Sequence, residues 1–225
     1  EAERILYTAS ELKQILSIGI PSSITNVMQS IGVMLLNNFL LPYGNDKIAS
    51  FGVVSKITMI VVMITVGFAF GGQPLYGYLY GAKLKQRMKD CLKYAYQLIV
   101  GISLTLSIVL SIAAPFMISI FMNDAVMIET GAPILRAVLL GMPFIGFVMV
   151  TTCVFQSCGK PTQALILSAG RQGIFYAILI FILHALLGYT GVIYAQAASD
   201  IFTSFVAYLL LKNTLLKELA ILAKR

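Results

Sequence analysis

Amide side chains placed inside a long apolar segment are the first residues of this sequence that could do chemistry. Asn26, Gln29 and Asn37 lie in one such segment and fall on roughly one face of a helix. A polar group at membrane depth is energetically expensive, so each is a candidate functional residue. The stripe predicts a water-filled cavity or binding groove, and interhelical hydrogen bonding is the alternative interpretation.

The next apolar segment carries a lysine and two methionines. Lys56 lies roughly ten residues beyond Asp46, a depth of about 15 Å along a helix. Its side chain does not easily reach the interface from there, so we expect the ammonium to face a cavity or an acid. Met59 and Met63 would supply an adaptable apolar lining. Further on, Gln73 precedes a proline, which predicts either a local opening of the helix or its end.

Two further charges, Arg171 and Asp200, lie in consecutive apolar segments at similar depth. Consecutive helices are usually neighbours. The two residues are therefore predicted to form a buried ion pair, with a coupling role for an Asp200 that exchanges a proton as the alternative.

The sequence contains no recognisable catalytic or metal-binding constellation. His184 is the single histidine, and no Gly-x-Ser-x-Gly or Walker A stretch is present. An intramembrane protease would need a nucleophilic serine facing His184, and no such motif is evident. The three cysteines follow no ligand spacing. We therefore predict no catalytic residue, no metal and no cofactor.

The composition determines which elements must position these side chains. Of 225 residues, 59% are hydrophobic and 11% are charged, whereas a soluble domain carries about a quarter charged residues. This excludes an ordinary soluble domain, a disordered chain and a coiled coil. We expect an all-α membrane protein, residues 1–225 forming one unit of six transmembrane helices. The predicted spans are 15–41, 49–76, 92–121, 132–155, 164–187 and 192–211.

Basic residues concentrate on one side of these spans, mainly in the loop 81–93 and near both ends of the chain. The positive-inside rule places this side in the cytoplasm, with both termini of the segment, and the net charge of +7 follows from the same loops. We therefore expect a multi-pass protein of the plasma membrane, surrounded by the lipid bilayer, with no nucleic-acid partner.

Several motifs, in their order and spacing, point to one family. They are Gly72-Gln73-Pro74, Tyr80-Gly81-Ala82, Phe155-Gln156, Gly159-Lys160-Pro161 and Ser199-Asp200. Together they resemble the C-terminal half of a multidrug and toxic compound extrusion (MATE) transporter. The DinF-like and MepA-like branches are more similar than the sodium-coupled NorM-like branch, because Gln29 and Phe147 stand where that branch has acids.

The resemblance implies one six-helix lobe of a twelve-helix transporter, with Asn26, Gln29 and Asn37 on the cavity side. It implies a secondary antiporter that exports amphipathic or cationic drugs in exchange for protons or sodium. The chain begins with Glu1 rather than Met, and we expect an N-terminal six-helix lobe as its partner. A lipid-linked oligosaccharide flippase of the same superfamily and a non-transporting half-size membrane protein are the alternatives.

Overall fold

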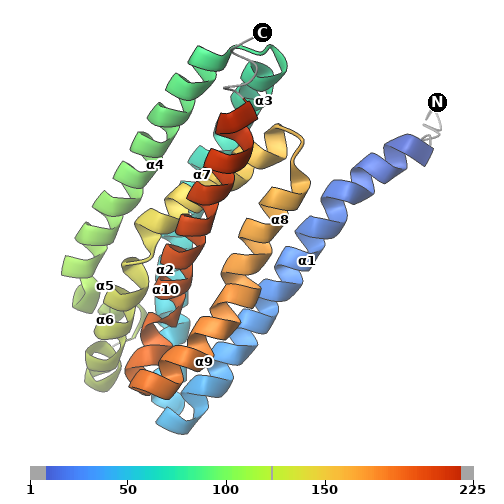
Figure 1. Ribbon diagram of the computed structural model, residues 1–225. Helices are drawn as coiled ribbons and strands as arrows, with labels where there is room; N and C mark the ends of the chain where they lie inside the picture. The colour runs from blue at the N-terminus through green and yellow to red at the C-terminus, as the bar shows by residue number, and fades with distance from the viewer. Residues whose placement is uncertain (1–8, 123, 219–225) are drawn as a thin grey trace, which may run out of the picture.

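The computed structural model describes residues 9–122 and 124–218. These residues form helices joined by short turns, with no strand among them (Figure 1). The prediction of an all-α fold is therefore confirmed. By length and composition, five stretches of helix in the described part of the chain can cross a membrane, and six can when the bent pair α6–α7 is taken as one span.

The helices follow one another in an up-and-down bundle (Figure 1). Their bounds are α1 Ala9–Leu40, η1 Leu41–Tyr43, α2 Asn45–Gly71, α3 Gln73–Gly81, α4 Lys85–Ile112, α5 Ala114–Phe121, α6 Ala125–Leu139, α7 Met142–Ser157, α8 Pro161–Ala169, η2 Gly170–Ile174, α9 Phe175–Leu187, α10 Tyr189–Leu210 and η3 Leu211–Leu216. Of these, η1 is a 3₁₀-helix, and η2 and η3 are π-helices.

The helices differ from the predicted segments at several points, because the segments predicted at 49–76, 92–121 and 164–187 are each interrupted in the structure. Helix α4 begins at Lys85, so most of the predicted loop 81–93 is helical, as expected for a stretch rich in Lys, Gln, Arg and Met. The segment predicted at 132–155 is two helices, α6 and α7, bent by 41° relative to each other. Hydropathy is continuous across the bend and therefore does not mark its position.

The bend between α6 and α7 follows from a proline. Pro143 has no backbone N–H, so the carbonyl of Leu139, four residues earlier, lacks its helical donor. The hydroxyl of Ser107 on α4 donates to this carbonyl. The freed backbone group is therefore satisfied inside the bundle, which a membrane interior requires.

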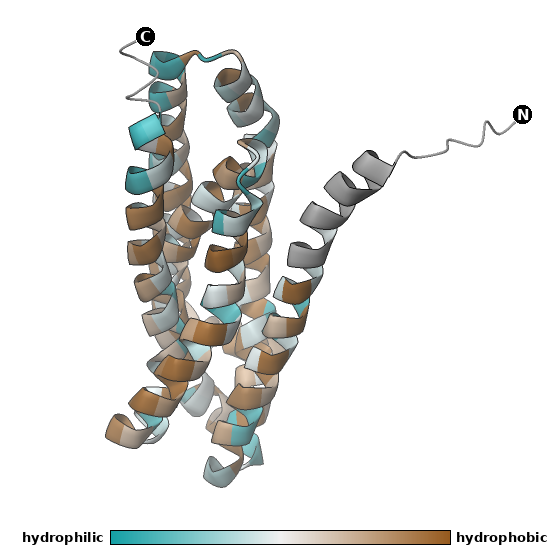
Figure 2. Cartoon of the chain, turned by 45° about the vertical axis from the view of Figure 1, so that its right-hand side comes forward, coloured by the Kyte–Doolittle hydropathy of each residue, from teal (hydrophilic) through white to brown (hydrophobic). Residues whose placement is uncertain are grey.

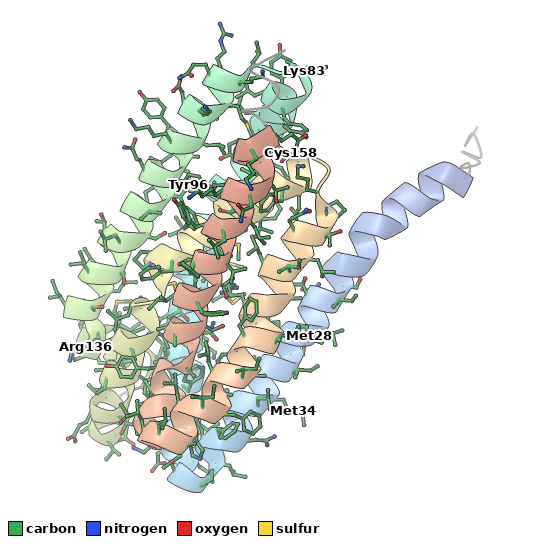
Figure 3. All side chains as sticks on the ribbon, viewed as in Figure 1. Met28, Met34, Lys83, Tyr96, Arg136 and Cys158 are labelled. Carbon is green, nitrogen blue, oxygen red and sulfur yellow. The ribbon has the colours of Figure 1, made fainter. Side chains whose placement is uncertain are left out.

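The break between α4 and α5 is built in the same way. Pro115 removes the donor for the carbonyl of Ser111. The Nε of Arg136 on α6 donates to that carbonyl at 3.1 Å. Figure 3 shows Arg136 at the edge of the bundle beside α5 and α6. This arginine therefore completes the end of a neighbouring helix.

The core lies along α7, which packs against α2, α3, α4, α8 and α10. Its side chains Val150, Val154 and Phe155 are fully buried. The outward surface remains apolar, with Ile112, Phe116 and other large side chains exposed. Figure 2 shows hydrophobic colour along much of the helices. Such a surface is typical of a protein in contact with lipid or with further apolar helices.

Candidate functional site

From Ser23 to Leu40, helix α1 packs on the bundle by one face. On that face the hydroxyl of Thr25 lies 3.1 Å from that of Ser168. A Cβ on Gly32 would lie only 2.6 Å from the carbonyl oxygen of Gln172, and Met28 lies against Gly173. Figure 3 shows Met28 on α1 beside the α8–α9 run. Close backbone approach at Gly32 therefore fixes which side of α1 faces the bundle.

The amide side chains predicted to line a cavity lie off this contact face. Asn26, Gln29 and Asn37 are all exposed, as are the neighbouring Ser30 and Asn38. They make no hydrogen bond to another helix among the described residues, which argues against the interpretation that they join helices of this bundle. The result is an exposed polar face on an otherwise apolar helix.

Helix α2 also has an exposed face that combines a charge with methionines. Lys56 is exposed, and Met59 and Met63 follow at helical spacing with 55% and 60% of their surface exposed. Lys56 forms no ion pair within the part of the chain that the structure describes. The expected acid partner is therefore not found among the described residues, and the exposed position is compatible with a place in a cavity.

Gln73 lies at the interruption between α2 and α3. Helix α2 ends at Gly71, α3 begins at Gln73, and the two together form one candidate span, Asn45–Gly81. The Nε2 of Gln73 donates to Oε1 of Gln156 on α7 at 3.4 Å. Two glutamines from separate motifs of the sequence thus meet, and Gln73 is half-buried rather than open to a cavity.

Arg171 and Asp200 form an ion pair inside the bundle. The Nη1 of Arg171 lies 3.2 Å from Oδ1 of Asp200, and their side chains are 7% and 0% exposed. The Nε2 of Gln196 donates to the same oxygen at 3.4 Å. The other carboxylate oxygen, Oδ2, is buried and has no hydrogen-bond partner among the described residues.

The arginine of this pair lies in the π-helix η2. Here the N–H of Phe175 donates to the carbonyl of Gly170, five residues earlier. The hydroxyl of Ser199 donates to the carbonyl of Arg171 at 2.7 Å. Segments of π-helix are frequent at functional sites. No π-helix was predicted from the sequence, and the glycines at 170 and 173 are the only local signal.

The carboxylate of the pair faces the break between α6 and α7. A Cβ on Gly141 would lie 2.7 Å from Oδ2 of Asp200 and 3.1 Å from Cα of Ala197. Only a glycine allows this approach. Asp200 therefore contacts two irregular points of the bundle, the π-helix and the bend, from its place on α10.

A second ion pair joins three segments at the end of the bundle near Lys83, the upper end in Figure 3. The carboxylate of Glu218 accepts hydrogen bonds from Nζ of Lys160 at 2.5 Å and from Oη of Tyr80 at 2.6 Å. These two bonds lower the pKa of Glu218 below that of an ordinary glutamate. Tyr80 and Lys160 both belong to the motifs quoted above, but their acidic partner was not anticipated.

Aromatic side chains gather at the opposite end, around His184. Its Nδ1 lies 3.5 Å from Oη of Tyr43, and its ring contacts that of Phe39. The Nζ of Lys47 lies 4.3 Å from the ring centroid of Tyr189, a cation–π contact. His184 is thus packed among aromatic rings near the end of α9.

The described residues hold no arrangement suited to metal chemistry, since no group of three or more His, Cys, Asp or Glu side chains is placed to share an ion. The bundle instead combines an exposed polar face with a buried ion pair. Its helices are long and apolar enough for a protein that crosses a membrane. Consistent with this, residues 21–190 match the MatE family model. The chain belongs to the MatE family.

The curated relatives of the chain include multidrug export proteins. The chain is 29% identical over 199 residues to the multidrug export protein MepA of Staphylococcus aureus (strain MRSA252), covering 88% of this chain and 44% of the relative. It is 26% identical over 203 residues to MepA of Staphylococcus saprophyticus, covering 90% of this chain and 45% of the relative. The chain thus spans less than half the length of these relatives.

Solved structures show the same fold. The MATE transporter VcmN of Vibrio cholerae in its bent form matches with a TM-score of 0.87 at 18% identity, over 97% of this chain and 50% of that one. A MOP superfamily transporter from Pyrococcus furiosus matches with a TM-score of 0.86 at 23% identity, over 100% of this chain and 50% of that one. The bundle therefore has the fold of one lobe of a twelve-helix transporter.

Proposed function

We propose that this chain forms the C-terminal lobe of a secondary multidrug antiporter of the plasma membrane. It would export amphipathic or cationic compounds in exchange for protons or sodium. The observation that carries the proposal is the exposed polar face of α1, with Asn26, Gln29 and Asn37. Such a face is unfavourable against lipid and favourable against a water-filled cavity.

The missing wall of that cavity would be an N-terminal lobe of six further helices. The chain spans 44% of the length of the MepA relatives. The rest of such a relative is long enough for a second lobe of this size. The exposed methionines of α2, Met59 and Met63, would then add an adaptable apolar lining. Gln73, which contacts Gln156, would lie at the edge of the cavity and not at the centre of the cavity.

The proposed orientation places the α3–α4 connection in the cytoplasm. Basic residues gather at this end of the bundle, as the positive-inside rule requires. They include Lys83, Lys85, Arg87, Lys89, Lys93, Lys160, Lys212 and Lys217. At the opposite end Lys47 is balanced by nearby Asp46. Both ends of the segment would therefore lie inside the cell.

The flippase alternative is less well supported. A cavity for a lipid-linked pyrophosphate needs several available cations. Arg171 is neutralised by Asp200, and its side chain is only 7% exposed. The exposed basic residue that remains is Lys56, on the face of α2 that carries Met59 and Met63. A single cation favours amphipathic compounds over a pyrophosphate.

The test is drug efflux by the full-length transporter in cells that lack other pumps. We expect Gln29→Ala and Asn37→Ala to lower resistance without lowering expression. Gln97→Ala, which removes an exposed amide from α4, is the matched control and should retain resistance. Wild-type resistance in both α1 variants at equal expression would contradict the cavity assignment.

A further inference from the structure

We propose that Asp200 is the group of this lobe that takes up and releases the coupled proton, and that its charge controls the contact between η2 and α1. The inference rests on the proposed antiporter function and names a residue that performs the coupling. Three features carry it: an incompletely satisfied carboxylate, a single cationic partner, and a chain of close contacts to α1.

The carboxylate is enclosed but not fully bound. Its side chain is 0% exposed, and Oδ2 accepts no hydrogen bond among the described residues. Arg171 approaches Oδ1 with one nitrogen at 3.2 Å instead of the two parallel bonds of a bidentate pair. A free lone pair on a buried carboxylate is a site to which a proton can bind.

The surroundings of Asp200 contain few competing groups. From η2 the facing group is Arg171, and from α10 itself it is Gln196. From α9, Tyr176 is the titratable side chain that interacts electrostatically with Asp200. At the α6–α7 break, the backbone of Gly141 approaches Oδ2 of Asp200. Among the described residues Asp200 is therefore the acid on which a proton would bind here.

Protonation changes the charge balance of the pair. A proton that binds Oδ2 converts the carboxylate to a neutral carboxylic acid, while Arg171 keeps its charge. An unpaired guanidinium in the interior is costly. The protonated state therefore favours a movement of Arg171, and of the η2 backbone that carries it, away from Asp200. Release of the proton restores the pair.

This movement would reach α1 through the face that packs on the bundle. The carbonyl of Gln172, the residue after Arg171, lies where a Cβ on Gly32 would be 2.6 Å away. One residue further on, Gly173 contacts Met28, which is adjacent in sequence to Gln29. A shift of η2 would therefore displace α1, which carries the proposed binding face on its exposed side. The two sites are linked by the close approach of Gly32 to the Gln172 carbonyl and by the contact of the Met28 side chain with Gly173.

The experiment uses the full-length transporter in proteoliposomes, with native cysteines replaced and spin labels at Val33 and Ile178. Both positions are exposed, on α1 and α9. We expect the distance between the labels to change with pH in the wild type and to stay constant in Asp200→Asn. Glu129→Gln, which neutralises an exposed acid, is the control and should retain the change. A pH-dependent distance in Asp200→Asn, or its absence in the wild type, would overturn the proposal.

If Asp200→Asn fails to fold, the double variant Arg171→Gln/Asp200→Asn replaces it, because it leaves no uncompensated buried charge. It should lose the pH response, and a retained response would contradict the inference. Drug efflux is measured on the same preparations. A pH response that depends on Asp200 in a protein without drug efflux would support this inference while refuting the proposed function. Drug efflux together with a wild-type pH response in both variants would support the proposed function and refute this inference.

Discussion

The hydroxyl of Ser107 donates a hydrogen bond to the carbonyl of Leu139, the group that Pro143 deprives of its helical donor. Leu139 is fully buried, and Ser107 is nearly so. The bond therefore connects α4 to the bend between α6 and α7, and it compensates for the proline within the apolar interior.

We expect Ser107→Ala to lower the stability of the protein by about 1–3 kcal/mol, the cost of a buried acceptor left unsatisfied. Thermal unfolding of the full-length protein in detergent measures this. Thr105→Ala, an exposed change on the same helix, should have a much smaller effect. Adding Pro143→Ala to Ser107→Ala should recover part of the loss, because residue 143 then donates to Leu139. Equal stability of Ser107→Ala and the wild type would refute this account.

Removal of one partner of the Arg171–Asp200 pair should be more damaging than removal of both. We expect Arg171→Gln to cost roughly 3–5 kcal/mol, since it leaves an uncompensated buried charge. The double variant Arg171→Gln/Asp200→Asn should be closer to the wild type. Unfolding temperatures of Arg171→Gln, Asp200→Asn and the double variant test this, and additive losses of the two single variants would argue against a direct interaction.

The close approach of α1 to η2 predicts opposite effects of two glycine substitutions. Gly32→Ala would place a methyl group 2.6 Å from the carbonyl oxygen of Gln172, so we expect lower stability and impaired efflux. Gly101→Ala on α4 meets nothing within 4 Å and should be neutral or stabilising by roughly 0.5–1 kcal/mol. Similar behaviour of the two variants in unfolding assays would show that α1 does not approach so closely.

The second ion pair predicts a pH dependence at the end of the bundle near Lys83. Hydrogen bonds from Lys160 and Tyr80 lower the pKa of Glu218, so its carboxylate stabilises the folded protein at pH values above the ordinary glutamate pKa. This contribution is lost as the pH falls through the lower pKa of the folded state. Hydrogen exchange in residues 211–218 should therefore accelerate on acidification in the wild type. Glu218→Gln should already exchange faster at neutral pH, and an unchanged rate would contradict the assignment.

Lys56 predicts a change in substrate preference. An unpaired ammonium in a water-filled cavity repels a bound monovalent cation by about 0.4 kcal/mol at roughly 10 Å. Lys56→Gln should therefore lower the apparent KM for a cationic compound about twofold and leave that for a neutral compound unchanged. Efflux of a cationic and a neutral dye by the same vesicles tests this. Equal changes for both dyes would place Lys56 outside the cavity.

Much of the architecture could be predicted from the sequence because the lipid environment imposes it. Long apolar segments must be helical, and the helical structure confirms that expectation. Arg171 and Asp200 could be paired in advance because they lie at similar depth on consecutive segments. Their contact at 3.2 Å is the kind of long-range relationship that simple depth counting can anticipate.

The irregular features could not be predicted in the same way. The bend at Gly141 and the π-helix at Arg171 leave hydropathy unchanged, and both depend on donors from other helices, Ser107 and Ser199. Glu218 was missed because its partners lie 58 and 138 residues away in sequence. Such contacts are determined by packing in three dimensions, which local sequence patterns do not report.

The short connection at Gly188 has a consequence for how the protein enters the membrane. It joins α9 directly to α10, so that the helix run carrying Arg171 and the helix carrying Asp200 form one hairpin. A lone arginine or aspartate at the centre of an inserting helix costs about 2.5–3.5 kcal/mol. Inserted together, the two charges neutralise each other before the other helices assemble around them. We expect biogenesis to depend on this hairpin leaving the translocon as a unit.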